Sequence, residues 1–149
     1  MPRLRSFFFG EPTTHTPAMD TGLLLLRLFA GIALAWAHGL GKLPPTERFI
    51  GSVGEMGYPA PELFAWAAGL AEVVGGLLVA IGLFTRPAAF LAFFSLMNAV
   101  VLRHAGDAFG EREKALLFAA IMLLFLLGGP GRYSLDSLIN RRRSPIRIG

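Results

Sequence analysis

Four long apolar stretches constrain this chain more than any other feature of its sequence. They run over residues 22–40, 63–84, 87–104 and 112–128. A helix needs about 20 mostly apolar residues to cross a bilayer, and charged side chains near its ends can reach the interface and extend a shorter span. None of the stretches alternates polar with apolar residues, as a membrane strand would. The sequence therefore predicts an all-α integral membrane four-helix bundle.

The composition excludes a small soluble fold and several kinds of chemistry. Of the 149 residues, 54% are hydrophobic and 16% are charged, whereas soluble domains carry about 25% charged residues. The chain has no cysteine, which removes disulfides, thiolate nucleophiles, iron–sulfur clusters and Cys-ligated zinc. Any redox chemistry must therefore depend on a bound cofactor or a partner.

The basic residues predict how the chain sits in the membrane. One side of the bundle, which holds both termini, carries eight arginines, namely Arg3, Arg5, Arg86, Arg132, Arg141, Arg142, Arg143 and Arg147. The other side carries five basic residues, namely Lys42, Arg48, Arg103, Arg112 and Lys114. Because basic residues accumulate on the cytoplasmic side, we expect both termini in the cytoplasm and a multi-pass protein of the cell (inner) membrane.

This arrangement divides the chain into three parts. Residues 1–20 form an N-terminal cytoplasmic or interfacial segment, residues 21–139 the four-helix membrane domain, and residues 140–149 a basic cytoplasmic tail. The tail has no interleaved aromatic residues and no folded module to position it, so we expect contact with anionic lipid and not with nucleic acid.

The connections between the stretches differ in length. The second and third stretches are joined by little more than Thr85-Arg86-Pro87, which predicts an antiparallel hairpin. Residues 41–62 are too many for a turn and are rich in Gly and Pro. This segment either folds over the outer mouth of the bundle or forms a loose surface loop.

Two ionisable residues, Arg27 and Glu72, lie inside the first and second stretches. A charge at bilayer depth costs at least about 2.5–3.5 kcal/mol on insertion scales, so each needs a partner or a function. The two residues differ in depth by on the order of 10 Å, which two extended side chains can span. We therefore expect Arg27 to pair with Glu72. The pair either fixes the register of the helices or forms a site for a polar headgroup or a proton.

Small residues accompany these charges on one face of each helix. Helical periodicity places Gly31 near Arg27 on the first helix, and Gly69 and Gly76 beside Glu72 on the second. Glycines allow close approach of helices in lipid. We therefore expect these two faces to pack together, with a buried polar site between them formed by Arg27, Glu72, His38 and Lys42.

A second polar cluster is expected at the outer end of the bundle. It contains Arg103, His104 and Glu113, near His38 and Lys42. Two histidines on different helices could in principle bind a metal or a haem. No local ligand spacing supports such a site, so we expect no metal and no haem there, and interpret these side chains as interfacial.

After the fourth stretch, the segment Gly128-Gly129-Pro130-Gly131 predicts a sharp helix end. Ser134 is placed to cap a short amphipathic helix over residues 135–140, which would lie on the cytoplasmic surface.

The order and spacing of several motifs resemble those of the DoxX family of small four-helix membrane proteins. These motifs are Arg27, Gly31, Gly39 and Lys42, then Glu72-Val73-Val74-Gly75-Gly76, Gly82-Leu83-Phe84-Thr85-Arg86, Glu113, and Gly131-Arg132-Tyr133-Ser134-Leu135-Asp136. The resemblance covers about residues 23–138. It implies a four-helix membrane fold. Some relatives are linked to a thiosulfate:quinone oxidoreductase, and others to quinone or oxidative-stress responses.

The paired charges and the resemblance favour a membrane subunit of a quinone-linked oxidoreductase or oxidative-stress system. Quinone would be the cofactor, its polar ring near Arg27, Glu72 or Lys42, and the partners would be the bilayer and a soluble or membrane oxidoreductase subunit. The sequence carries no independent catalytic motif, and homo-oligomerisation stays open. The alternative is a non-enzymatic membrane scaffold or small-molecule carrier.

Overall fold

The structure, a computed structural model, describes residues 16–103 and 105–142. The predicted site residue His104 and parts of both terminal segments, residues 1–15 and 143–149, lie outside the described residues. Everything described is helix or connecting loop. The all-α prediction is therefore confirmed for this part of the chain.

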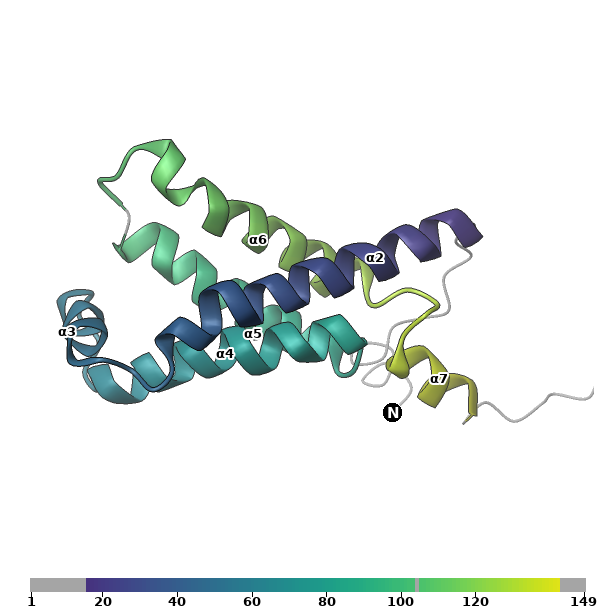
Figure 1. The fold of residues 1–149 in the computed structure, drawn as a ribbon, viewed down its shortest axis with the longest axis horizontal. Helices are drawn as coiled ribbons and strands as arrows, with labels where there is room; N and C mark the ends of the chain where they lie inside the picture. Colours follow the sequence, from purple (N-terminus) through teal and green to yellow (C-terminus); the bar gives the residue numbers. More distant parts are fainter. Residues whose placement is uncertain (1–15, 104, 143–149) are drawn as a thin grey trace, which may run out of the picture.

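The bundle consists of four long helical segments that follow one another in the chain. The first is α2 (Pro17–Ala33), which continues as the π-helical η1 (Leu34–Gly39) and the short 3₁₀ turn η2 (Leu40–Lys42). The others are α4 (Pro61–Ile81), α5 (Thr85–Asn98) with the π-helical η3 (Ala99–Arg103), and α6 (Phe109–Gly128). Two short helices, α3 (Glu47–Glu55) and α7 (Leu135–Arg142), lie at opposite ends of the bundle, which we call the α3 end and the α7 end (Figure 1).

Three of the four predicted spans are long and apolar enough to cross a membrane. Among the described residues these are residues 17–42, 61–81 and 85–103. α6 packs along α5, but Glu111, Arg112, Glu113 and Lys114 occupy its first turns and shorten its apolar part. The start of α2 and α7 share one end of the bundle (Figure 1). A fourth crossing by α6 and the cytoplasmic placement of the termini stay predictions.

The helix ends are set by local chemistry. α2 begins at Pro17, five residues before the predicted start at residue 22, because the Thr16 hydroxyl accepts a hydrogen bond from the Met19 amide (3.3 Å) and proline suits the first turn. α4 ends where Gly82 adopts the left-handed conformation (φ 71°), and the Leu83 amide turns back to the Leu78 carbonyl (3.0 Å). α5 then starts at Thr85, which makes the tight hairpin expected from the sequence.

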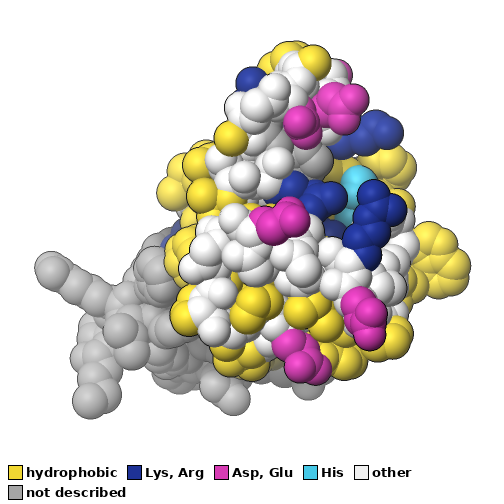
Figure 2. All heavy atoms as spheres, turned by 90° about the vertical axis from the view of Figure 1, so that its left-hand side faces the viewer, with side chains coloured by type: hydrophobic (Ala, Val, Ile, Leu, Met, Phe, Trp, Pro, Cys, Tyr) yellow, Lys and Arg dark blue, Asp and Glu magenta, His cyan; other side chains and the backbone are white. Residues whose placement is uncertain are grey.

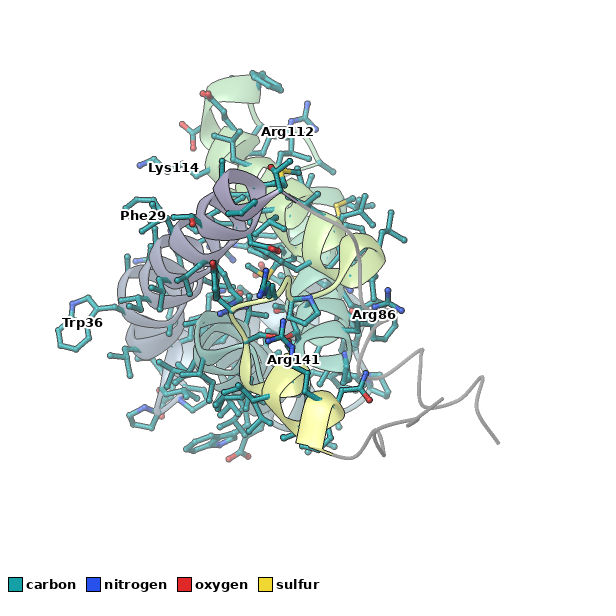
Figure 3. All side chains as sticks on the ribbon, turned by 90° about the vertical axis from the view of Figure 1, so that its right-hand side faces the viewer. Phe29, Trp36, Arg86, Arg112, Lys114 and Arg141 are labelled. Atoms are coloured by element: carbon teal, nitrogen blue, oxygen red, sulfur yellow. The ribbon has the colours of Figure 1, made fainter. Side chains whose placement is uncertain are left out.

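The core combines alanines with a few large apolar side chains. The buried cluster includes Ala30 and Leu34 on α2, Ala92 on α5, and Met122 and Phe125 on α6. Large apolar side chains point outward instead: Phe29 is 72% exposed and Trp36 is 75% exposed, and both project from the bundle (Figure 3). A surface of this kind is suited to lipid, which solvates apolar side chains.

Glycines bring α2 and α4 into backbone contact. A Cβ atom added to Gly31 would lie 2.4 Å from the carbonyl oxygen of Gly76, and one added to Gly76 would lie 2.7 Å from that of Gly31. Gly69 has a different neighbour, because its added Cβ would lie 2.5 Å from Cδ2 of Leu43. It leaves room for the chain that follows η2, whereas Gly31 and Gly76 allow the two helices to touch.

We predict that Gly31→Ala lowers the free energy of unfolding by about 2 kcal/mol, because the new methyl group has no space between the backbones. Gly22→Ala on the same helix is the matched control, since its added Cβ would meet nothing within 4 Å. The control should leave stability unchanged or raise it by up to about 1 kcal/mol through helix propensity. Unfolding in mixed micelles, followed by circular dichroism, measures both; equal effects would contradict the close contact.

Candidate functional site

Arg27 is buried near the α7 end and bonds to backbone carbonyls. Its Nε donates to the carbonyl of Ala80 (3.0 Å), its Nη1 to Pro130 (2.5 Å) and its Nη2 to Tyr133 (2.6 Å). The predicted Arg27–Glu72 pair is therefore wrong. The last carbonyls of a helix lack partners inside that helix and carry partial negative charge. Ala80, in the last turn of α4, has such a carbonyl, and Pro130 and Tyr133 lie in the loop after α6. Glu72 lies eight residues before Ala80 on α4, about 12 Å along the helix axis.

The same end is held together by a buried aspartate of α7. Asp136 is fully buried, and its carboxylate accepts hydrogen bonds from the amides of Phe84 (2.8 Å) and Thr85 (2.9 Å) and from the Thr85 hydroxyl (2.8 Å). The hydroxyl of Ser134 caps α7 by accepting from the Ser137 amide (3.1 Å), as predicted. We call Arg27, Thr85 and Asp136 the α7-end interlock, because together they join α2, the α4–α5 turn and α7. Their arrangement is that of a structural clamp.

Glu72 forms a separate polar centre in the half of the bundle nearer α3. Its side chain is fully buried. Its Oε1 accepts from Nζ of Lys42 at 2.5 Å and from Oγ of Ser95 at 3.3 Å. These partners come from η2 and α5, so the carboxylate joins three helical segments. Ser95 is not among the predicted site residues, but a hydroxyl inside an apolar stretch indicates a hydrogen-bond donor between helices, and Ser95 is one.

The second carboxylate oxygen of Glu72 is buried and unpaired. No described residue hydrogen-bonds to Oε2. Buried polar atoms in proteins are nearly always hydrogen-bonded, and an exception calls for an explanation such as a catalytic role or a bound molecule. Oε2 is thus a free acceptor in a carboxyl group whose other oxygen accepts from Lys42.

Glu72 lies in the wall of a cavity of about 620 Å³ at the α3 end. This volume falls within the range of about 300–1,000 Å³ that is usual for ligand sites. α3 covers the cavity with Phe49, Val53 and Met56. Of the two interpretations of residues 41–62, the structure therefore supports a segment folded over the mouth of the bundle. That this segment contains a helix was not predicted.

Polar side chains gather around the mouth of the cavity, and Figure 2 shows Lys and Arg side chains with a histidine on this face. His38 lines the cavity and packs edge-to-face on the Phe118 ring, with centroids 5.0 Å apart. Arg103 also lines it, whereas Glu113 is not among the lining residues and its neighbours Glu111 and Lys114 are.

The structure thus brings His38, Lys42, Glu72 and Arg103 of the predicted site residues to one cavity and leaves Arg27 elsewhere. Within the described ranges, no three His, Asp or Glu side chains are grouped as a metal ion would require.

Two helices change their winding beside this cavity. η1 contains His38, η2 contains Lys42, and η3 contains Arg103. π-helical turns are rare and are frequent at functional sites, and here two of them adjoin one cavity. Apolar periodicity does not reveal such turns, because one wider turn barely alters the pattern.

Comparison with known proteins gives the family context. The DoxX family model matches residues 22–105. The chain is similar to YphA of Escherichia coli K12, named an inner membrane protein, at 32% identity over 91% of this chain and 99% of YphA. YqjF of the same strain, also named an inner membrane protein, is 32% identical over 83% of this chain and 95% of YqjF. CatD of Bacillus subtilis 168, whose name describes a candidate oxidoreductase, is 34% identical over 82% of this chain and 90% of CatD. No solved structure matches this chain significantly.

We predict that Arg27→Lys lowers the free energy of unfolding by about 3 kcal/mol, because one ammonium group cannot serve three carbonyls in different directions and leaves buried acceptors unpaired. Arg132→Lys, at an exposed position in the loop before α7, should change stability by less than about 0.5 kcal/mol. Denaturation in mixed micelles compares the two. An Arg27→Lys protein as stable as the control would contradict the clamp.

For the Glu72 centre, we predict that Lys42→Met destabilises the protein by about 2 kcal/mol, since it leaves a buried carboxylate without its cation. Adding Glu72→Gln should recover much of this loss, because the two residues interact directly. Lys114→Met, at an exposed position lining the same cavity, is the control and should be nearly neutral. The double-variant cycle measures the coupling; additive effects would count against the pair.

Proposed function

The chain belongs to the DoxX family of membrane proteins, and from this premise we propose that it is the quinone-binding membrane subunit of an oxidoreductase. The names of YphA and YqjF support an inner-membrane location, and the name of CatD supports redox chemistry. The observation that carries the proposal is the unpaired, buried Oε2 of Glu72 in the wall of a mainly apolar cavity.

The residues of the cavity suit a quinone. A bound quinone supplies redox chemistry, in which two electrons and two protons convert it to a quinol. Its ring is apolar, like the faces of Phe49, Phe94 and Phe118 that line the cavity. The quinol form carries two hydroxyl donors, and Glu72 Oε2 is a buried acceptor for one of them. The quinone form carries carbonyl acceptors, for which Lys42 has donors beyond the one that it gives to Glu72.

Glu72 and Lys42 would handle the proton. Glu72 Oε2 accepts the hydrogen bond of one quinol hydroxyl. When the partner subunit takes the two electrons of the quinol, this oxygen takes one of the two released protons and the other leaves to water at the mouth of the cavity. In quinone reduction the same proton and electrons move in the opposite direction. Lys42 donates to the other oxygen, Oε1, at 2.5 Å. The Lys42 side chain is 29% exposed, so it also links the buried carboxylate to the mouth of the cavity. The chain has no cysteine, and we assign the exchange of electrons to a partner oxidoreductase subunit.

A small-molecule carrier is the second candidate. The cover that α3 forms over the cavity favours it, because a carrier needs a site that can be closed from one side. A carrier would bind the same ligand without changing its redox state. If the chain is an oxidoreductase subunit, quinone reduction by native membranes depends on Glu72. If it is a carrier, quinone reduction does not depend on Glu72.

We predict that Glu72→Gln weakens binding of decylubiquinol by about tenfold, because the amide is a poorer acceptor than a carboxylate for a donated hydroxyl. Titration calorimetry on protein in nanodiscs measures the affinity. Glu62→Gln is the matched control, since Glu62 is an exposed carboxylate in the first turn of α4 outside the cavity lining.

Equal affinity of the Glu72→Gln protein and the wild type would contradict the proposed site. Weaker binding together with unchanged quinone reduction in native membranes, at normal protein levels, would favour the carrier over the oxidoreductase subunit.

A further inference from the structure

The cavity begins where close packing between α4 and α5 ends. Near their connecting turn the two helices touch through small residues: a Cβ added to Gly75 would lie 3.2 Å from the carbonyl oxygen of Ala88 and 3.6 Å from Cβ of Ala92. Toward the α3 end, Ala68 on α4 and Phe94 on α5 instead line the cavity, and Leu91 lines it at the level of the Gly75 contact. The helix pair is therefore closed at one end and lined by cavity at the other.

Several apolar residues of both helices line the cavity and keep a large exposed fraction. Phe64 on α4 is 38% exposed, Leu91 is 54% exposed and Phe94 is 57% exposed. They belong to segments long and apolar enough to cross a membrane, residues 61–81 and 85–103. In a bilayer, the exposed surface of such segments would meet acyl chains. We call Phe64, Ala68, Leu91 and Phe94 the α4–α5 window.

A cross-link of side chains bounds the window at the α3 end. The Tyr58 hydroxyl donates to Oδ1 of Asn98 on α5 (2.6 Å), and its ring packs on that of Phe64 on α4, with centroids 4.4 Å apart. Tyr58 thus connects the two helices beyond the window. With the Gly75 contact at the other end, the window is framed on both sides, and α3 lies over the cavity as a cover.

The cavity wall has a polar centre and apolar parts, which include Ala115 and Phe118 on α6 and the α4–α5 window. Lys42, Glu72 and Ser95 form the polar centre, and His38 and Lys114 line the wall contributed by η1 and α6. The window carries only apolar side chains. A molecule that matches this distribution has a polar head and an apolar tail.

On the basis of the proposed quinone site, we infer that the cavity opens sideways into the bilayer through the α4–α5 window. It would bind an amphiphile whose polar head lies at Glu72 and whose apolar tail lies in the window. The ligand class is therefore a lipid-soluble, long-chain quinone or quinol that enters from the membrane. A water-soluble ring without a tail would use only the polar half of the site.

Two quinols with the same head, one with a tail and one without, distinguish the contribution of the window to binding from that of the head site. Decylubiquinol carries a ten-carbon tail, and the corresponding tail-less quinol carries none. Ala68→Phe places a ring in the window and should weaken decylubiquinol binding by about tenfold or more through lost burial of the tail, while the affinity for the tail-less quinol changes by less than about threefold. Ala120→Phe, at an exposed α6 position outside the cavity, is the matched control and should alter neither.

Glu72→Gln should weaken both ligands, because both carry the hydroxyl that it binds. If it weakens neither, the proposed function fails. Suppose that Glu72→Gln weakens the binding of both ligands. If Ala68→Phe then leaves decylubiquinol binding unchanged, or weakens the binding of both ligands equally, the proposed window is wrong and the head site is supported.

Photolabelling of the wild-type protein tests the window without a substitution. A decylubiquinol with a diazirine at the end of its tail should label the peptides that contain Phe64, Leu91 or Phe94. Labelling confined to the α6 peptide with Phe118, on the other wall of the cavity, would overturn the inference.

Discussion

Arg27 donates hydrogen bonds to the carbonyls of Ala80, Pro130 and Tyr133, and this contact joins α2 to the end of α4 and to the loop before α7. In a bilayer, every exposed polar group must find a partner inside the protein. The guanidinium is suited to this task, since its donors point in several fixed directions. Together with Asp136, which accepts from the amides of Phe84 and Thr85, it gives partners to buried backbone groups at the end of α4 and in the loop before α7.

Because the α7 end is closed in this way, the opposite end can remain open. The bundle is held by the interlock and by the contact of Gly31 with Gly76, so the helices at the α3 end need not pack to the same density. There the chain can bear a buried carboxylate with one unpaired oxygen, π-helical turns and a cavity of about 620 Å³. Features that reduce stability collect at functional sites and depend on rigid surroundings.

Sequence reasoning identified the charged residues that matter but not all of their partners. It singled out Arg27, Lys42 and Glu72 because ionisable side chains in apolar stretches are rare. It paired Arg27 with Glu72 because the sequence indicates how deep a residue lies along its helix. The sequence does not show which backbone carbonyls lie near a buried arginine. The bond of Ser95 to Glu72 and the helical form of the segment over the cavity escaped it, since each depends on which segments meet across the bundle.

The sequence by itself determined the all-α membrane character of this protein, because apolar stretches of spanning length admit helices and little else. It also determined the tight turn at Thr85 and the cap at Ser134, since both depend on neighbouring residues alone. Only the tertiary structure decided that Arg27 binds backbone carbonyls and that Glu72 pairs with Lys42. The physical reason is that a buried charge is stabilised by whichever partner lies in contact, and contacts between distant segments are set by the packing of the whole bundle.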